Sequence, residues 1–91
     1  MQQKSVSAGN VVFANDKPFS LIAGPCQVES RAHAFEMAHA IKEIAHGLGI
    51  GVVFKASYDK ANRTSLGATR GIGVDQGLAI LSDIREEVGI P

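Results

Sequence analysis

Some residue types that mark specialised classes of protein are scarce in this sequence. It has one cysteine, no tryptophan and 5% aromatic residues, and its nine basic residues balance nine acidic ones. A single cysteine cannot form an internal disulfide, and the charge balance lacks the basic footprint of a nucleic-acid binder. No apolar run approaches the roughly 20 residues of a membrane span, and the start, residues 1–4, has no signal-peptide apolar core. We therefore expect a cytoplasmic protein with neither nucleic acid nor membrane as a partner.

The apolar residues that are present suit helices and parallel strands. They make up 45% of the 91 residues and are mainly alanine, valine, isoleucine and leucine. Two short extended runs, 5–7 and 11–14, flank the turn dipeptide Gly9-Asn10 and predict a β-hairpin within residues 1–15. The run 19–23, which Gly24-Pro25 stops, predicts a strand buried on both faces.

Helical periodicity follows in two places. Ser30 is a candidate N-cap for a helix that runs to about His46, and Gly47 and Gly49 follow it. The apolar residues expected on its buried face are Met37, Ile41, Ile44 and Leu48. Residues 50–54 predict a second buried strand, and a later helix ends before Gly89. The expected buried face of that helix consists of Leu78, Leu81, Ile84 and Val88.

Residues 19–91 thus predict a βαβα arrangement of the α/β class. Two parallel strands alone leave open edges, and residues 89–91 are typical of the link between a helix and a next strand. We therefore expect a truncated piece of a larger α/β domain.

Three cations follow the second predicted strand. Lys55 is the first residue after the strand, and Lys60 and Arg63 lie in a polar stretch beyond it. Ammonium and guanidinium groups bind phosphate and carboxylate, so this stretch predicts a site for a small phosphorylated metabolite. The alternative is that these charges only solvate a surface loop.

The longer motifs resemble those of the 3-deoxy-D-manno-octulosonate 8-phosphate synthase family. The resemblance rests on Ala14-Asn15-Asp16, Ala23-Gly24-Pro25-Cys26, the stretch 54–65 and Arg70-Gly71-Ile72-Gly73. It implies a (β/α)8 TIM barrel with an N-terminal hairpin at its bottom, a fold that typically needs about 250 residues. The chain would then hold the hairpin and the first two βα units.

The resemblance also implies a reaction and its residues. The family is a transferase of lipopolysaccharide biosynthesis that condenses phosphoenolpyruvate with D-arabinose 5-phosphate, and its members are usually homotetramers. Lys55 and Lys60 resemble the catalytic lysines that hold phosphoenolpyruvate, and Asn62 resembles the contact to the aldose. Arg63, with Thr64, resembles the group that reaches the sugar phosphate of a neighbouring subunit.

Cys26 places the chain, by the same resemblance, among the members that use a divalent metal ion: zinc, iron or manganese. The other implied ligands, a histidine and two carboxylates, would lie beyond Pro91. The alternative for a lone cysteine is a small buried apolar group. His39 and His46 are seven residues apart on one predicted helix, roughly 10 Å, which is too far to share an ion.

Two other functions remain open. One is a 3-deoxy-D-arabino-heptulosonate 7-phosphate synthase, although that family usually reads Lys-Pro-Arg-Thr where this chain has Lys60-Ala61-Asn62-Arg63. The other is a non-catalytic barrel fragment, and we expect the 91 residues alone to be inactive.

Overall fold

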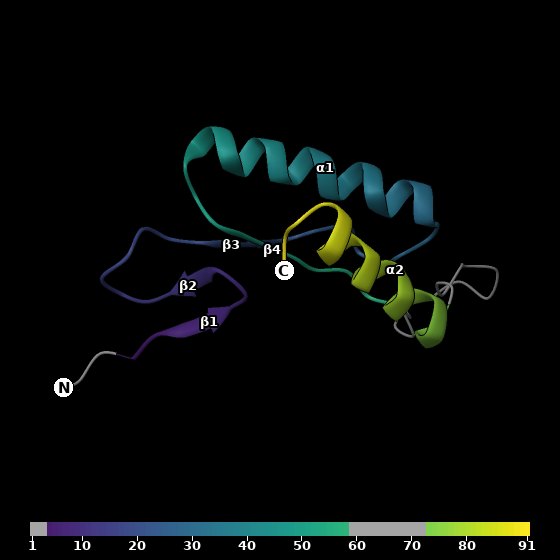
Figure 1. Cartoon of the computed structure of the whole chain (residues 1–91), viewed down its shortest axis with the longest axis horizontal. Coiled ribbons are helices and arrows are strands. Elements are labelled where there is room, and N and C mark those ends of the chain that lie inside the picture. Colours follow the sequence, from purple (N-terminus) through teal and green to yellow (C-terminus); the bar gives the residue numbers. More distant parts are fainter. Residues whose placement is uncertain (1–3, 59–72) are drawn as a thin grey trace.

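The computed structural model describes residues 4–58 and 73–91. Figure 1 shows a hairpin followed by strand, helix, strand and helix, in the predicted order. The elements are β1 (Val6–Ala8), β2 (Val11–Phe13), β3 (Leu21–Ala23), α1 (Arg31–Leu48), β4 (Val52–Phe54) and α2 (Val74–Glu87). The α/β class is therefore confirmed, and every strand is shorter than or shifted from its predicted range.

The hairpin is antiparallel, with Ser7 opposite Val12. Gly9 in its turn has a φ of 58°, a left-handed conformation that glycine adopts without steric strain. The hairpin lies beside the starts of the other two strands, because a Cβ on Gly51 would be 3.0 Å from Val11. Ser20 Oγ also donates to the carbonyl of Val12 at 3.3 Å.

β3 and β4 form a parallel pair, in which Ile22 is the partner of Val53. The amide of Leu21 donates to the carbonyl of Gly51 at 2.9 Å, and the amide of Lys55 donates to the carbonyl of Ala23 at 3.0 Å. Because backbone groups alternate between strand edges, the amide of Phe54 points away from β3. It donates to the carbonyl of Pro91 at 2.6 Å, so the end of the chain lies along the other edge of β4.

Ser30 caps α1 as predicted, and the helix ends two residues later than predicted, at Leu48 before Gly49. Ser30 Oγ accepts from the amide of His33 at 3.1 Å. Gly49 ends the helix in the left-handed conformation, with φ 70°, and its amide donates to the carbonyl of His46 at 3.1 Å. Gly47 lies within α1 rather than after it.

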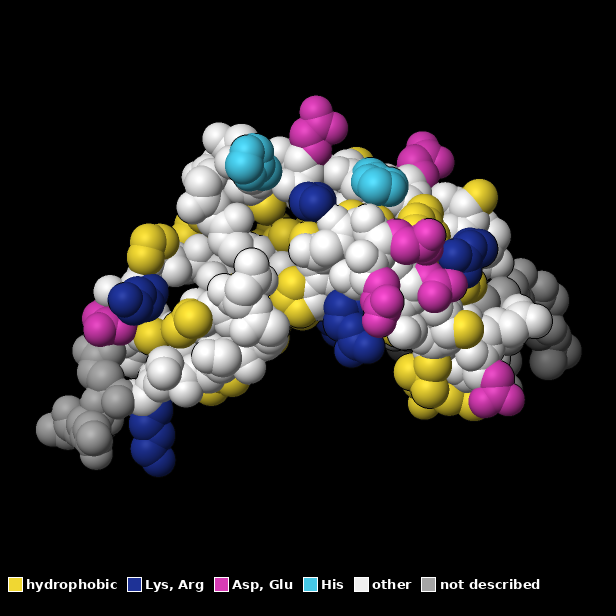
Figure 2. All heavy atoms as spheres, viewed as in Figure 1, with side chains coloured by type: hydrophobic (Ala, Val, Ile, Leu, Met, Phe, Trp, Pro, Cys, Tyr) yellow, Lys and Arg dark blue, Asp and Glu magenta, His cyan; other side chains and the backbone are white. Residues whose placement is uncertain are grey.

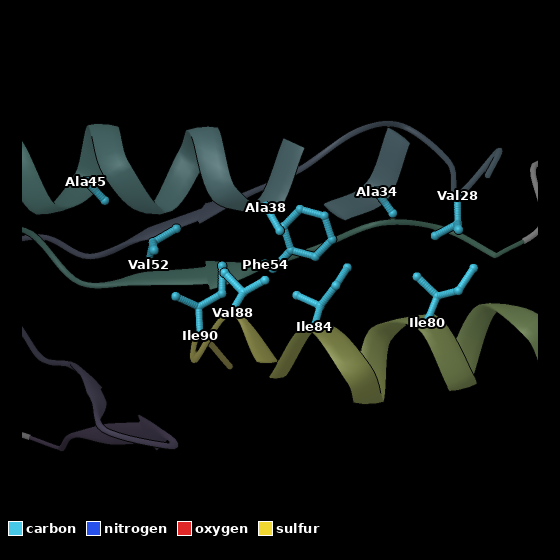
Figure 3. Close-up of a cluster of buried hydrophobic side chains, with 10 residues drawn as sticks. All are labelled: Val28, Ala34, Ala38, Ala45, Val52, Phe54, Ile80, Ile84, Val88 and Ile90. Carbon is cyan, nitrogen blue, oxygen red and sulfur yellow. The ribbon is translucent and has the colours of Figure 1, made fainter. Parts of the chain in front are cut away.

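The core lies between the two helices and one face of the parallel pair. Figure 3 shows Phe54 of β4 between alanines of α1 and isoleucines of α2. The buried residues of this core are Val28, Ala34, Ala38, Ala45, Val52, Phe54, Ile80, Ile84, Val88 and Ile90. Small alanines on α1 bring that helix close to β4, and the larger residues of α2 fill the remaining space.

This packing corrects the predicted buried face of α1. Ile44 and Leu48 are 61% and 69% exposed. The core side consists instead of Ala34, Ala38 and Ala45, with Met37 and Ile41 half-buried beside them. The periodicity was helical as predicted, but the helix faces the core with its smallest residues.

Two further burial predictions differ from the structure. Ile22 is 57% exposed, so β3 is not buried on both faces: among the described residues, both helices pack on the side of Val52 and Phe54. Leu78 on α2 is 54% exposed, whereas Ile84 is buried as predicted.

Polar contacts join the two helices. Arg31 Nη1 lies 2.7 Å from Asp83 Oδ2, and Arg31 Nη2 lies 3.3 Å from Glu87 Oε2. Lys42 Nζ donates to the carbonyl of Val88 at 2.5 Å, at the end of α2. These contacts link the surfaces of α1 and α2, and the apolar core between the helices packs them together.

Candidate functional site at the strand ends

The carboxyl ends of β3 and β4 lie side by side, because the two strands are parallel and in register. Cys26 follows β3 and Lys55 follows β4, and both side chains are exposed. The hydrogen bond from the Lys55 amide to the Ala23 carbonyl joins the two ends directly. A thiol and an ammonium group are thus available at one edge of the sheet.

Gly24 allows this close approach. A Cβ at this position would lie only 1.8 Å from the carbonyl oxygen of Lys55, far inside any real contact. The main chain of Gly24, just after β3, therefore lies against the main chain of Lys55, with no room for a side chain.

The pairing continues past the strands. Gln27 forms an isolated parallel bridge with Ser57, and the amide of Val28 donates to the carbonyl of Ser57 at 2.8 Å. Gln27 is only 2% exposed, although it is polar and lies next to Cys26. Its bridge to Ser57 and its burial place Gln27 in this extended pairing.

Most of the predicted substrate-binding residues lie outside the described residues. These are Lys60, Asn62, Arg63 and Thr64. Of the predicted lysines, the structure describes only Lys55, which lies at the strand end. The roles of all five residues stay predictions.

The structure corrects the alternative role of Cys26, the predicted metal ligand. Cys26 is exposed, so its thiol is not a buried apolar group in the described structure. Within residues 4–58 and 73–91, no three His, Cys, Asp or Glu side chains are grouped so as to hold a metal ion. Figure 2 shows histidines spread along α1 rather than gathered, and both His39 and His46 are exposed. Cys26 alone supplies one ligand, and a metal site needs three or four.

The other edge of β4 carries an apolar groove of about 350 Å³ beside α2. Phe54, Leu78, Leu81 and Pro91 contribute to its lining, and Lys55 and Cys26 do not. It is therefore separate from the polar edge where β3 and β4 end.

Comparison with known proteins identifies the family. Residues 2–91 match the DAHP synthetase I family. The chain belongs to this family. It is 65% identical over 86 residues to a 2-dehydro-3-deoxyphosphooctonate aldolase of Bartonella quintana, covering 94% of this chain and 31% of the relative. A protein of the same name from Rhodopseudomonas palustris is 63% identical over 86 residues, covering 94% of this chain and 30% of the relative.

These relatives confirm the resemblance drawn from the motifs. The chain spans about a third of the length of the curated relatives that it matches. In the part of the chain that the structure describes, no helix is both long and apolar enough to cross a membrane.

Proposed function

We propose that this chain is the N-terminal part of an enzyme that condenses phosphoenolpyruvate with D-arabinose 5-phosphate. Water is the third reactant, and the products are 3-deoxy-D-manno-octulosonate 8-phosphate and inorganic phosphate. The observation that carries the proposal is the 65% identity, over 94% of the chain, to a relative named for this eight-carbon product. The reaction belongs to lipopolysaccharide biosynthesis, which is consistent with a cytoplasmic enzyme.

The fold proposed for the whole protein is a (β/α)8 TIM barrel. Support comes from a parallel pair whose helices cover one face, and from the hairpin at the starts of β3 and β4. The carbonyl of Pro91 accepts from the amide of Phe54 on the free edge of β4, where a third parallel strand would pair. The groove lined by Leu78 and Leu81 would then receive the next elements of the barrel.

Substrates would bind at the carboxyl ends of the strands, as they do in barrels of this kind. Lys55 and Lys60 would hold the anionic groups of phosphoenolpyruvate, and Asn62 would bind the aldose. Arg63 and Thr64 would reach the sugar phosphate bound to a neighbouring subunit of a homotetramer. Fixed cations can stabilise developing charge without reorganising, which is the contribution expected of the two lysines.

The chemistry needs three bond changes. The enol carbon of phosphoenolpyruvate attacks the aldehyde carbon of the sugar, and water adds to the adjacent carbon. Phosphate then leaves with cleavage of its carbon–oxygen bond, which leaves the ketone of the product. Lys55 and Lys60 would bind the charged groups throughout this sequence.

Cys26 would supply one thiolate to a divalent metal ion such as zinc, iron or manganese. Such an ion, when bound, polarises oxygen atoms as a Lewis acid. The exposed thiol at the strand end is consistent with this role. The other ligands would come from elsewhere in the whole protein.

A chimeric enzyme tests the proposal. This chain replaces the matching N-terminal third of the Bartonella quintana relative, and phosphate release is measured with phosphoenolpyruvate and arabinose 5-phosphate. We expect turnover by the chimera and none by the 91 residues alone. Lys55→Ala should lower kcat/KM by about 100-fold or more, the effect of removing one fixed charge-stabilising group. Lys17→Ala, which removes an exposed lysine near the hairpin, is the matched control and should change nothing.

The competing function is the synthase of the seven-carbon product, after which the matched family is named, although the relatives are named for the eight-carbon product. It would use erythrose 4-phosphate in place of arabinose 5-phosphate. Faster turnover of the chimera with the four-carbon sugar would therefore refute our choice of substrate.

A further inference from the structure

Tyr58 packs against a glycine inside α2. Gly77 is buried in that helix, and a Cβ at this position would lie 2.5 Å from the Cβ of Tyr58. The amide of Gly73, at the N-terminal end of α2, also donates to the carbonyl of Tyr58 at 3.3 Å. We call this contact of Tyr58 with Gly73 and Gly77 the Tyr58 seat.

The main chain just before the seat is held from the opposite side. The amide of Lys55 donates to the carbonyl of Ala23 at 3.0 Å, and the carbonyl of Ser57 accepts from the amide of Val28 at 2.8 Å. Residues 55–58 therefore run between the extension of β3 and the first turn of α2. Lys55 begins this held stretch, and Lys60 follows it by two residues.

We propose that Gly77 is a positioning residue for Lys55, the predicted anion-binding lysine that the structure describes. Its missing side chain lets Tyr58 approach α2, and the seat holds the main chain that runs from Lys55 to Tyr58. The inference rests on the proposed role of Lys55 and adds to it a residue that holds its main chain in place.

Helix energetics support a specific role for this glycine. Glycine in a helix interior is about 0.5–1 kcal/mol less favourable than alanine, so local propensity alone favours alanine at position 77. Gly77 has no positive φ, so no backbone requirement explains it either. Gly47, inside α1, has nothing within 4 Å of its ideal Cβ and serves as a matched control.

The test compares Gly77→Ala with Gly47→Ala in the chimeric enzyme described above. Gly77→Ala should lower kcat/KM by about 100-fold, the effect of a misplacement of about 1 Å in a catalytic constellation. The loss should appear in KM for phosphoenolpyruvate as well as in kcat, at a temperature where both variants are fully folded. Gly47→Ala should keep the parent kinetics.

Second-site variants separate positioning from general damage. The clash at position 77 involves the Cβ of Tyr58, so Tyr58→Gly removes it and Tyr58→Ala does not. Gly77→Ala with Tyr58→Gly should recover activity by about tenfold over Gly77→Ala alone, whereas Gly77→Ala with Tyr58→Ala should not. If Gly77→Ala prevents folding, the two second-site variants are compared for folded protein. Recovery with Tyr58→Gly but not with Tyr58→Ala supports the seat.

Three results would overturn the proposal: parent kinetics in folded Gly77→Ala, a loss confined to thermal stability, or equal rescue by both Tyr58 variants. Failure of the proposed function is seen separately, as an inactive parent chimera with either sugar. In that case the affinity of the two glycine variants for inorganic phosphate is measured by calorimetry. Weaker binding in Gly77→Ala than in Gly47→Ala supports the proposed role of Gly77, and equal binding refutes it.

Discussion

Gly24→Ala should disrupt the candidate site more than any other single methyl group added to the described glycines. The new Cβ would lie 1.8 Å from the carbonyl oxygen of Lys55, against a practical minimum of 3.0 Å. The Lys55 carbonyl must therefore move by about 1.2 Å before the contact becomes possible. Gly24 has no positive φ, so alanine meets only this steric conflict and no backbone strain.

The magnitude follows from what this movement breaks. The Lys55 amide donates to the neighbouring Ala23 carbonyl at 3.0 Å, and losing that hydrogen bond destabilises the fold by about 1 kcal/mol. Forcing an extra group into a packed position adds about 1–3 kcal/mol. The total is about 2–4 kcal/mol. In the chimeric enzyme, whose barrel has roughly 250 residues, this lowers the melting temperature by roughly 4–16 °C.

The assay is thermal unfolding of the chimeric enzyme, with phosphate release measured below the transition. Gly47→Ala is the control, because its new Cβ meets nothing within 4 Å and alanine favours the helix. We expect Gly24→Ala to melt lower and to lose activity even while folded, since Lys55 is displaced. Equal melting temperatures for the two variants would show that the strand ends are not in the close contact described.

Substitutions at three other positions test local structure in the same chimera by thermal unfolding. Ser30→Ala removes the side-chain acceptor that caps α1 and should destabilise by about 1 kcal/mol, whereas Ser30→Asp should restore the cap. Gly49→Ala places a side chain at φ 70° and should destabilise by about 1–2 kcal/mol, and no loss there would contradict the left-handed cap. Arg31→Met breaks ion pairs whose members are about half exposed, so we expect less than about 1 kcal/mol, shrinking further in high salt.

The order of elements could be predicted because its signals are local. Ser30 at the start of α1 and Gly49 at its end form caps from residues within four positions of each other. The hairpin turn at Gly9 is likewise decided by neighbouring residues. Each of these features depends on short-range geometry that a single sequence contains.

The buried face of α1 could not be predicted from apolar periodicity alone. Ile44 and Leu48 are larger and more apolar than Ala38 and Ala45, so a ranking by hydrophobicity chooses the wrong side. The structure buries the alanines because α1 lies close to β4 and α2, a distance set by residues elsewhere in the chain. The exposure of Ile22 has the same origin, since both described helices pack on the opposite face of the parallel pair.

The candidate site also has some features that the sequence predicts and others that only the structure shows. That Lys55 and Cys26 follow neighbouring strands was readable, because strand ends can be found from apolar runs and parallel strands end at one edge. The contact between Gly77 and Tyr58 could not be found, since it joins residues 19 positions apart through the absence of a side chain. Gly24 was visible only as a strand terminator, and its contact with the Lys55 carbonyl needed the register of β3 and β4.

The contacts of Gly24 and Gly77 bear on how the position of Lys55 is determined. Lys55 directly follows β4, so the position of its side chain depends on the main chain between Lys55 and Tyr58. That main chain is located by two glycines, Gly24 on one side and Gly77 on the other. Removing the charge of Lys55 tests anion binding, whereas adding a methyl group at either glycine tests the position of the main chain. A search limited to ionisable residues would therefore find Lys55 and miss Gly24 and Gly77, which contact the main chain of Lys55 and the side chain of Tyr58.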